Sequence, residues 1–227
     1  MILELILNEV SYSTEQMILM IAFFVISAIA AISINKFVHA LIARRYGDVS
    51  AKKIVSKNPL RKISSSNVLS IFVMLLFGFS WVKNSKPQSS RGKNMFIALS
   101  GPLANIIACF IGLILYQVFF IIAEIFYKVG QNSILEGVLS LIMAFVSVNT
   151  AFAIFNLIPV PPLDGGNFIA QFLPEEIKET YLSFEKYSLF VLVFLIIFLA
   201  RSGISNILIG GLINGLQAII LPIFSLI

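Results

Sequence analysis

Six long stretches without a charged residue constrain this chain more than any other feature of its sequence. They cover residues 16–35, 63–82, 94–123, 137–163, 187–200 and 202–227. Runs of about 20 apolar residues are long enough to cross a bilayer as helices. Because these runs leave no room for a soluble domain, we predict an all-α, polytopic membrane helix bundle of about five to six hydrophobic segments. We expect residues 1–227 to form a single integral-membrane domain.

The charged residues are distributed unevenly along the chain. Twelve of the 16 Lys and Arg residues lie between Lys36 and Lys93, together with a single acid, Asp48. Cytoplasmic loops of membrane proteins carry an excess of Lys and Arg. We therefore expect residues 44–93 to be cytoplasmic and the N-terminus to lie outside, in a bacterial-type cell membrane. Because the basic block flanks hydrophobic runs, it indicates a lipid bilayer as its neighbour and not a nucleic acid.

The run at residues 63–82 is unusual because basic residues flank it on both sides. A span would place one of these flanks outside, which its positive charge opposes. We therefore predict that this run is re-entrant: it enters the membrane and returns. The other runs predict a first span at 17–46, followed by spans at 94–126 and 137–157 that a short outside loop at 127–133 joins. After these we expect an amphipathic cytoplasmic piece at 174–186, a short span at 187–200, and a span or hairpin at 202–227.

Small residues indicate where helices are expected to pack. A stripe at helical spacing within the run at 94–123 predicts a close helix contact, and its members are Ser100, Ala104, Ala108 and Gly112. Gly101 and Pro102 lie in the same run and predict a kink or a break. Gly211 and Gly215 form a weaker packing motif in the last run.

Three prolines end the fourth run abruptly. Residues 156–166 read NLIPVPPLDGG, and Pro159, Pro161 and Pro162 cannot extend a helix, because proline lacks the N–H and clashes with the preceding turn. Non-helical backbone at membrane depth is tolerated only where it is buried in protein or lines a watery cavity. A carboxylate there, Asp164, is a candidate functional residue. The alternative is a surface turn just outside the bilayer, which this composition also suits.

A second polar group lies at the inner end of the first span. Asn35, Lys36 and His39 fall within about one and a half helical turns, and His39 is the only histidine in the chain. Asn35 and His39 are four residues apart and share a helix face. The alternative is that Lys36 extends to the headgroups while the other two bond to neighbouring helices. Since the first and fourth runs both end on the expected cytoplasmic side, we expect this group to meet Asp164.

These two groups belong to a pattern that resembles the site-2 proteases, a family of zinc-dependent intramembrane metalloproteases. NLIPVPPLDGG is similar to the family's N-x-x-P-x-x-x-L-D-G motif. Further similar stretches follow the family's order, namely residues 39–48 (HALIARRYGD), 58–60 (NPL), 77–81 (FGFSW) and 100–105 (SGPLAN). The resemblance covers roughly residues 30–172. It implies that the motif and substrate-binding positions are Asn156, Pro159, Leu163, Gly165 and Asn105.

In that family, two histidines of an H-E-x-x-H helix and the motif aspartate hold zinc, and the glutamate is the general base. The resemblance implies that His39 and Asp164 are the remaining zinc ligands. It places Asn35 at the position of the first histidine and Lys36 at the position of the glutamate. Catalytic zinc usually has three protein ligands, an amide oxygen is a poor substitute for imidazole, and an ammonium group repels a dication. We therefore expect no intact catalytic residue, and zinc that is absent or weakly bound.

The resulting hypothesis is a catalytically impaired pseudoprotease that binds membrane-protein segments or a membrane partner. One alternative is an active zinc-dependent intramembrane endopeptidase with an atypical metal site. Another is a channel or transporter-like protein that uses the polar centre for ions. Zinc content separates the first two hypotheses, and ion flux in liposomes tests the third.

Overall fold

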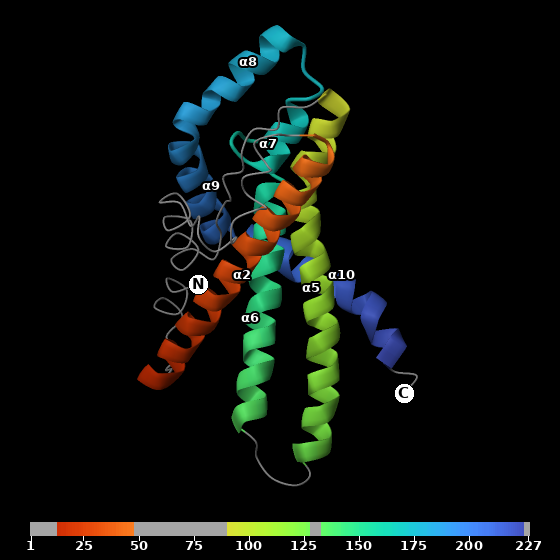
Figure 1. Cartoon of the computed structure of the whole chain (residues 1–227). Helices are drawn as coiled ribbons and strands as arrows, with labels where there is room; N and C mark the ends of the chain where they lie inside the picture. The colour runs from red at the N-terminus through yellow and green to blue at the C-terminus, as the bar shows by residue number, and fades with distance from the viewer. Residues whose placement is uncertain (1–12, 48–89, 128–132, 225–227) are drawn as a thin grey trace.

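The computed structural model describes residues 13–47, 90–127 and 133–224, and these ranges contain helices and no strands (Figure 1). The predicted all-α class is confirmed. The predicted re-entrant run at 63–82 and most of the loop at 127–133 lie outside the described residues. The elements are α2 (Thr14–Arg45), α5 (Arg91–Tyr127), α6 (Ser133–Asn156), α7 (Asp164–Ile169), α8 (Glu175–Ser183), the 3₁₀ turn η2 (Phe184–Tyr187), α9 (Ser188–Ser202) and α10 (Ile204–Phe224).

Four of these helices, α2, α5, α6 and α10, are long and apolar enough to cross a membrane. The shorter α9 has 15 residues, or about 22 Å, which is less than the roughly 30 Å of a hydrocarbon core. It meets the α8–η2 piece at a bend of 73°, and this bent pair would make a fifth membrane element. The chain is an integral membrane protein. The last run is one helix, α10, and not a hairpin.

The first span begins where its sequence supplies a cap. The Ser13 hydroxyl accepts the backbone N–H of Gln16 at 3.2 Å, and the Gln16 side chain accepts the N–H of Ser13 at 3.0 Å. This reciprocal pair satisfies two of the donors that a helix N-terminus leaves open. At the other end, Arg44 and Arg45 lie in the last turn of α2, where cations interact favourably with the helix dipole.

The predicted small-residue stripe of α5 is buried, and at Gly112 it packs closely on α6. A Cβ added to Gly112 would lie 2.8 Å from Val146 of α6. Nearby, the Cys109 thiol and the Thr150 hydroxyl are 3.1 Å apart. α5 continues through Pro102, so the predicted break is absent. The physical reason is that α2 and α6 both pack on α5, and neighbouring helices in membrane proteins support a helix that contains proline.

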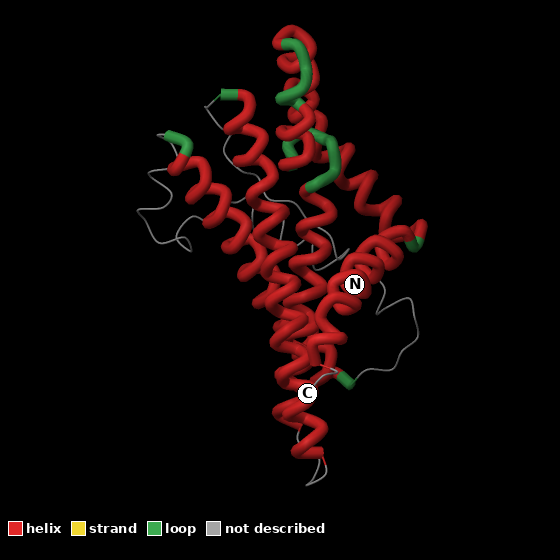
Figure 2. The backbone as a smooth tube through the Cα atoms, turned by 90° about the vertical axis from the view of Figure 1, so that its right-hand side faces the viewer, coloured by secondary structure: helices red, strands yellow, loops and turns green. Residues whose placement is uncertain are grey.

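The described helices pack together as one bundle (Figure 2). Two larger apolar clusters hold it together. The first joins α2, α6 and α9 to the segment after α6; it includes Ala31, Ile32, Phe152, Phe155, Leu163, Leu192 and Ile196. The second joins α5 and α6 to α10; it includes Leu113, Val146, Ile213 and Ile220. The packing motif predicted in α10 is wrong for the described residues. A Cβ at Gly211 or Gly215 would meet nothing within 4 Å, because α10 packs through Ile213 and Ile220 instead.

Candidate functional site

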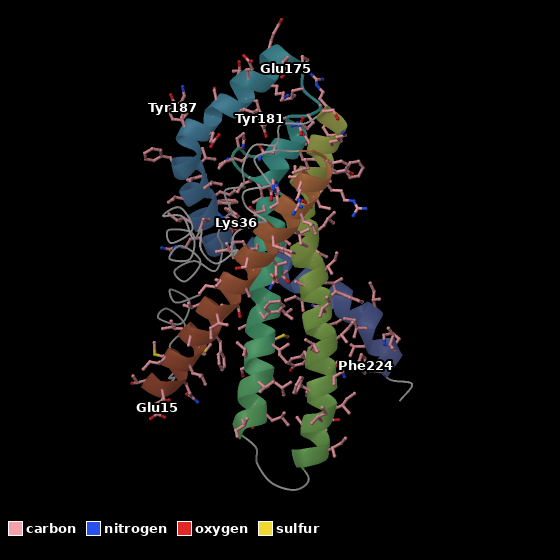
Figure 3. All side chains as sticks on the ribbon, in the orientation of Figure 1. Glu15, Lys36, Glu175, Tyr181, Tyr187 and Phe224 are labelled. Carbon is pink, nitrogen blue, oxygen red and sulfur yellow. The ribbon has the colours of Figure 1, made fainter. Side chains whose placement is uncertain are left out.

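The polar group of α2 lies against the interior of the bundle. Asn35 is fully buried, His39 is buried and Lys36 is half-buried; Figure 3 labels Lys36 on α2. Asn35 packs on α5 at Gly101, where an added Cβ would lie 2.6 Å from Nδ2 and 2.8 Å from Oδ1 of the amide. Gly101 therefore leaves the space that Asn35 occupies. The glycine beside Pro102 serves the packing of α2 on α5 and not a helix break.

The proline segment, residues 157–163, is non-helical as predicted and begins where α6 ends at Asn156. Asn156 is fully buried, and its Nδ2 donates to the carbonyl of Phe152 at 2.8 Å. Three of the seven residues in the segment are prolines, which have no N–H. The other four N–H groups donate to carbonyls nearby: Leu157 to Ala153 at 3.2 Å, Ile158 to Phe155 at 3.2 Å, Val160 to Ile158 at 2.8 Å, and Leu163 to Val160 at 2.9 Å.

Asp164 is fully buried and is the first residue of α7, so it directly follows the non-helical segment, whereas we expected it within that segment from the sequence. Leu163, the residue before it, is extended with φ of −67° and ψ of 159°. The two glycines that follow explain the local fold. A Cβ on Gly165 would meet the carbonyl of Leu157 and would lie 2.6 Å from the carbonyl oxygen of Ile158. A Cβ on Gly166 would lie 2.6 Å from the backbone nitrogen of Pro161. The first turn of α7 therefore packs directly on the backbone of the proline segment.

The fold brings the two predicted polar groups to one region of the bundle. Leu163, next to Asp164, belongs to the same buried cluster as Ile32, which lies one turn before Asn35 on α2. α5 contacts both α2 and α7, and Gly101 is one of its contacts to α2. The C-terminal end of α2, the start of α5, and α7 and α8 all lie toward one end of the molecule (Figure 1).

Two buried amides lie deeper between the helices. Asn105 of α5 is fully buried, and neither polar atom of its side chain has a hydrogen-bond partner within the described part of the chain. Asn149 of α6 is also fully buried; its Nδ2 donates to the carbonyl of Phe145 at 2.8 Å, while its Oδ1 has no partner there. Sequence reasoning named Asn105 and missed Asn149. The signal was available, because Asn149 is a polar residue within a long, mostly apolar run, as Asn105 is.

The residues at this site do not fit a catalytic zinc ion. Within the described ranges, no three His, Cys, Asp or Glu side chains are grouped so that they could hold a metal. The expected positions supply one imidazole from His39, one carboxylate from Asp164 and one amide from Asn35, whereas catalytic zinc usually has three strong protein ligands. The one cysteine, Cys109, lies beside Thr150 in the α5–α6 contact. The side chain of Lys36 adds a cation to the same helix turn as Asn35.

Helix α8 joins this region from outside the four long spans. The Tyr181 hydroxyl donates to the carbonyl of Pro159 at 2.8 Å, and burial raises the pKa of the Tyr181 phenol. Glu175 accepts hydrogen bonds from Arg91 at 2.8 Å and from Lys178 at 2.9 Å. The bond from Arg91, and then that from Lys178, lowers the pKa of the Glu175 carboxyl. Sequence reasoning missed Tyr181, because its partner lies 22 residues earlier and no local pattern links the two.

Comparison with known proteins gives consistent similarities. Residues 23–199 match the model of peptidase family M50. "Putative zinc metalloprotease YwhC" of Bacillus subtilis (strain 168) is 26% identical over 213 residues, which cover 89% of this chain and 91% of that protein. "Putative zinc metalloprotease MJ0611" of Methanocaldococcus jannaschii is 30% identical over 150 residues, which cover 63% of this chain and 68% of that protein. No solved structure matches.

Proposed function

The chain belongs to peptidase family M50, the site-2 protease family, and from this premise we propose that it is a membrane pseudoprotease. It keeps the intramembrane fold of the family as a single integral-membrane domain. It binds membrane-protein segments or a membrane partner and does not cut them.

The observation that carries this proposal is a pair of adjacent residues on α2, of which Asn35 is buried and Lys36 is half-buried. Asn35 and Lys36 stand where the family resemblance expects a zinc-binding histidine and the glutamate that acts as general base. His39 and Asp164 remain, and both are buried. Loss of a positioned general base alone typically costs about 10²–10⁴ in rate. A cation at Lys36 further opposes the binding of a dication.

Binding without cleavage is supported by the buried amides of the interior. Asn105 of α5 and Asn149 of α6 are fully buried and carry polar atoms that have no partner among the described residues. A side-chain amide can both donate and accept hydrogen bonds. Such groups suit the backbone of a membrane segment whose own helical hydrogen bonds have opened. Of the motif positions, Asn156, Leu163 and Gly165 are buried, and Pro159 is exposed.

The proposed setting is a bacterial-type cell membrane, with residues 44–93 cytoplasmic and the N-terminus outside. Arg44 and Arg45 at the end of α2, and Arg91 and Lys93 at the start of α5, are exposed. The ends of α2 and α5 that carry them lie together at one end of the molecule (Figure 1). An excess of Lys and Arg is typical of the cytoplasmic side.

The test is the zinc content of the purified chain and of an Asn35→His/Lys36→Glu variant, which rewrites the helix turn as H-E-x-x-H. We expect no stoichiometric zinc in the parent. In the double variant we expect roughly one zinc per chain, held by the introduced histidine, His39 and Asp164. Asn35→His alone serves as the matched control and should bind poorly, because Lys36 still repels the metal.

Each alternative has a distinct outcome. Stoichiometric zinc in the parent chain would favour an active endopeptidase with an atypical metal site and would overturn the proposal. Ion flux through liposomes that contain the parent, at rates above those of empty liposomes, would favour a channel or transporter. A folded double variant without zinc would mean that the site has changed at more positions than these two.

A further inference from the structure

Helix α8 makes a specific contact with the proline segment. Tyr181, in the last turns of α8, donates its hydroxyl to the carbonyl of Pro159 at 2.8 Å, and its ring is half-buried. Figure 3 labels Tyr181 on α8 above the bundle. The two residues are 22 positions apart, so the bond fixes tertiary structure and not a local turn.

The beginning of α8 is tied to a different helix. Glu175 accepts a hydrogen bond from the guanidinium of Arg91, the first residue of α5, at 2.8 Å. Lys178, one turn further along α8, also donates to Glu175, at 2.9 Å. α8 therefore connects two places: the start of α5 through Glu175, and the proline segment through Tyr181.

A restraint on Pro159 is transmitted to Asp164 because the two lie in one packed unit. The first turn of α7 rests on the backbone of residues 157–161, and Gly165 and Gly166 leave no space between them. Leu163 is fully buried and anchors the same unit in the core. Displacing Pro159 would therefore displace the start of α7 as well.

We propose that Tyr181 is a positioning residue for the Asp164 site, and that α8 acts as a strap between α5 and the proline segment. This inference rests on the proposed function. A site whose donors do not fit a catalytic zinc ion has to be held in shape by protein contacts. The Tyr181–Pro159 bond holds the segment from the outside, while Leu163 holds it from the core.

The experiment is hydrogen exchange of backbone amides, measured by mass spectrometry on the full chain in detergent. Tyr181→Phe removes one hydroxyl and keeps the ring. We expect amides 163–170 to exchange roughly two- to fivefold faster than in the parent, the range for the loss of one neutral hydrogen bond at a partly exposed site. Tyr187→Phe is the matched control: Tyr187 is exposed and its ring lies 4.9 Å from Lys186, so exchange at 163–170 should not change.

A second variant tests the other end of the strap. Glu175→Gln removes the charge that Arg91 and Lys178 bind, and should speed exchange in α8 and, to a smaller extent, at residues 163–170. Unchanged exchange at 163–170 in either variant, or a change confined to residues 175–183, would overturn the proposal and leave α8 as a merely packed helix. The readout involves no metal, so zinc in the parent would defeat the pseudoprotease proposal without altering this result.

Discussion

At the scale of single residues, two pairs of helical glycines differ in their surroundings. Gly165 and Gly166 lie against backbone atoms of the proline segment, so neither has room for a side chain. Gly211 and Gly215 lie on a face of α10 where a Cβ would meet nothing within 4 Å. The first pair is required by close packing of backbone on backbone, and the second is not required by any contact in the described chain.

Gly165→Ala should therefore destabilise the protein strongly, while Gly211→Ala should not. The added methyl group at 165 would overlap the carbonyl of Leu157, and backbone atoms cannot move aside as a flexible side chain can. We expect a loss of at least about 1–3 kcal/mol for Gly165→Ala. For Gly211→Ala we expect a change between zero and a gain of about 1 kcal/mol, from helix propensity. Denaturant unfolding in detergent measures both, and equal effects would contradict the close packing.

A second prediction concerns Lys36 and Asp164. A buried carboxylate is unfavourable unless it is paired or protonated, and the family resemblance makes Lys36 the nearest expected cation. Lys36→Ala should destabilise the protein, by less than the about 3–5 kcal/mol of a fully buried pair, because Lys36 is only half-buried. Adding Asp164→Ala should recover much of this loss. Thermal unfolding measures these changes, and Lys186→Ala, at an exposed lysine, is the control. A Lys36→Ala variant that is as stable as the parent would exclude a pair between Lys36 and Asp164.

Much of the site could be predicted at this scale because polar residues are rare in apolar runs. Asn35, His39 and Asp164 stand out for this reason, and all three are buried. Asn149 carries the same signal and could have been predicted. Tyr181 could not, because tyrosine is common at the ends of membrane helices and its role depends on where α8 lies.

At the scale of elements, proline has two different outcomes in this chain. Pro102 lies inside α5, which continues past it, whereas Pro159, Pro161 and Pro162 end α6 and leave seven residues non-helical. A single proline removes one helical hydrogen bond, which packing on two neighbouring helices can offset. Three prolines within four residues remove more helical hydrogen bonds than such packing can offset. Helix boundaries were therefore predictable from sequence where prolines cluster, and the effect of an isolated proline was not.

The anchoring of α8 predicts a dependence on pH. Because hydrogen bonds from Arg91 and then Lys178 lower the pKa of Glu175 from its ordinary value of 4.5, the folded state keeps this carboxylate charged to lower pH than the unfolded chain does. The stabilisation is present above that ordinary value and is lost as the pH falls through the lowered one. The melting temperature of the parent should exceed that of Glu175→Gln by a small, constant margin at neutral pH, and the margin should close in acid. A margin that stays constant as the pH falls well below this ordinary value would contradict this assignment.

At the scale of the whole molecule, one end collects the features that define the site. The end of α2, the start of α5, the proline segment, α7 and α8 lie there, and the long spans extend away from it (Figures 1 and 2). This arrangement follows from the order of spans and the lengths of the runs, so sequence predicted it. The crossing of α8 over that end depends on the 73° bend before α9, which no sequence pattern specified.

The orientation of this end is testable by cysteine labelling. α5 has 37 residues, or about 55 Å of helix, so its two ends should lie on opposite sides of a roughly 30 Å core. In a Cys109→Ala background, Ser90→Cys should react with an impermeant reagent from the cytoplasmic side and Gln131→Cys from the outside. The parent is the control and should stay unlabelled, because Cys109 is fully buried. Labelling of both positions from one side would contradict the orientation.

The hydrogen bonds of residues 157–163 have a consequence for how a membrane protein can interrupt a helix. An interrupted helix normally releases N–H groups that find no water in hydrocarbon. Here the three residues that would have released them are prolines, and the four remaining N–H groups all have acceptors. Pro161 is buried, so Pro161→Ala would bring a new hydrogen-bond donor into a place that offers it no solvent. In this segment proline is useful for the hydrogen atom that it lacks as much as for the rigidity of its ring.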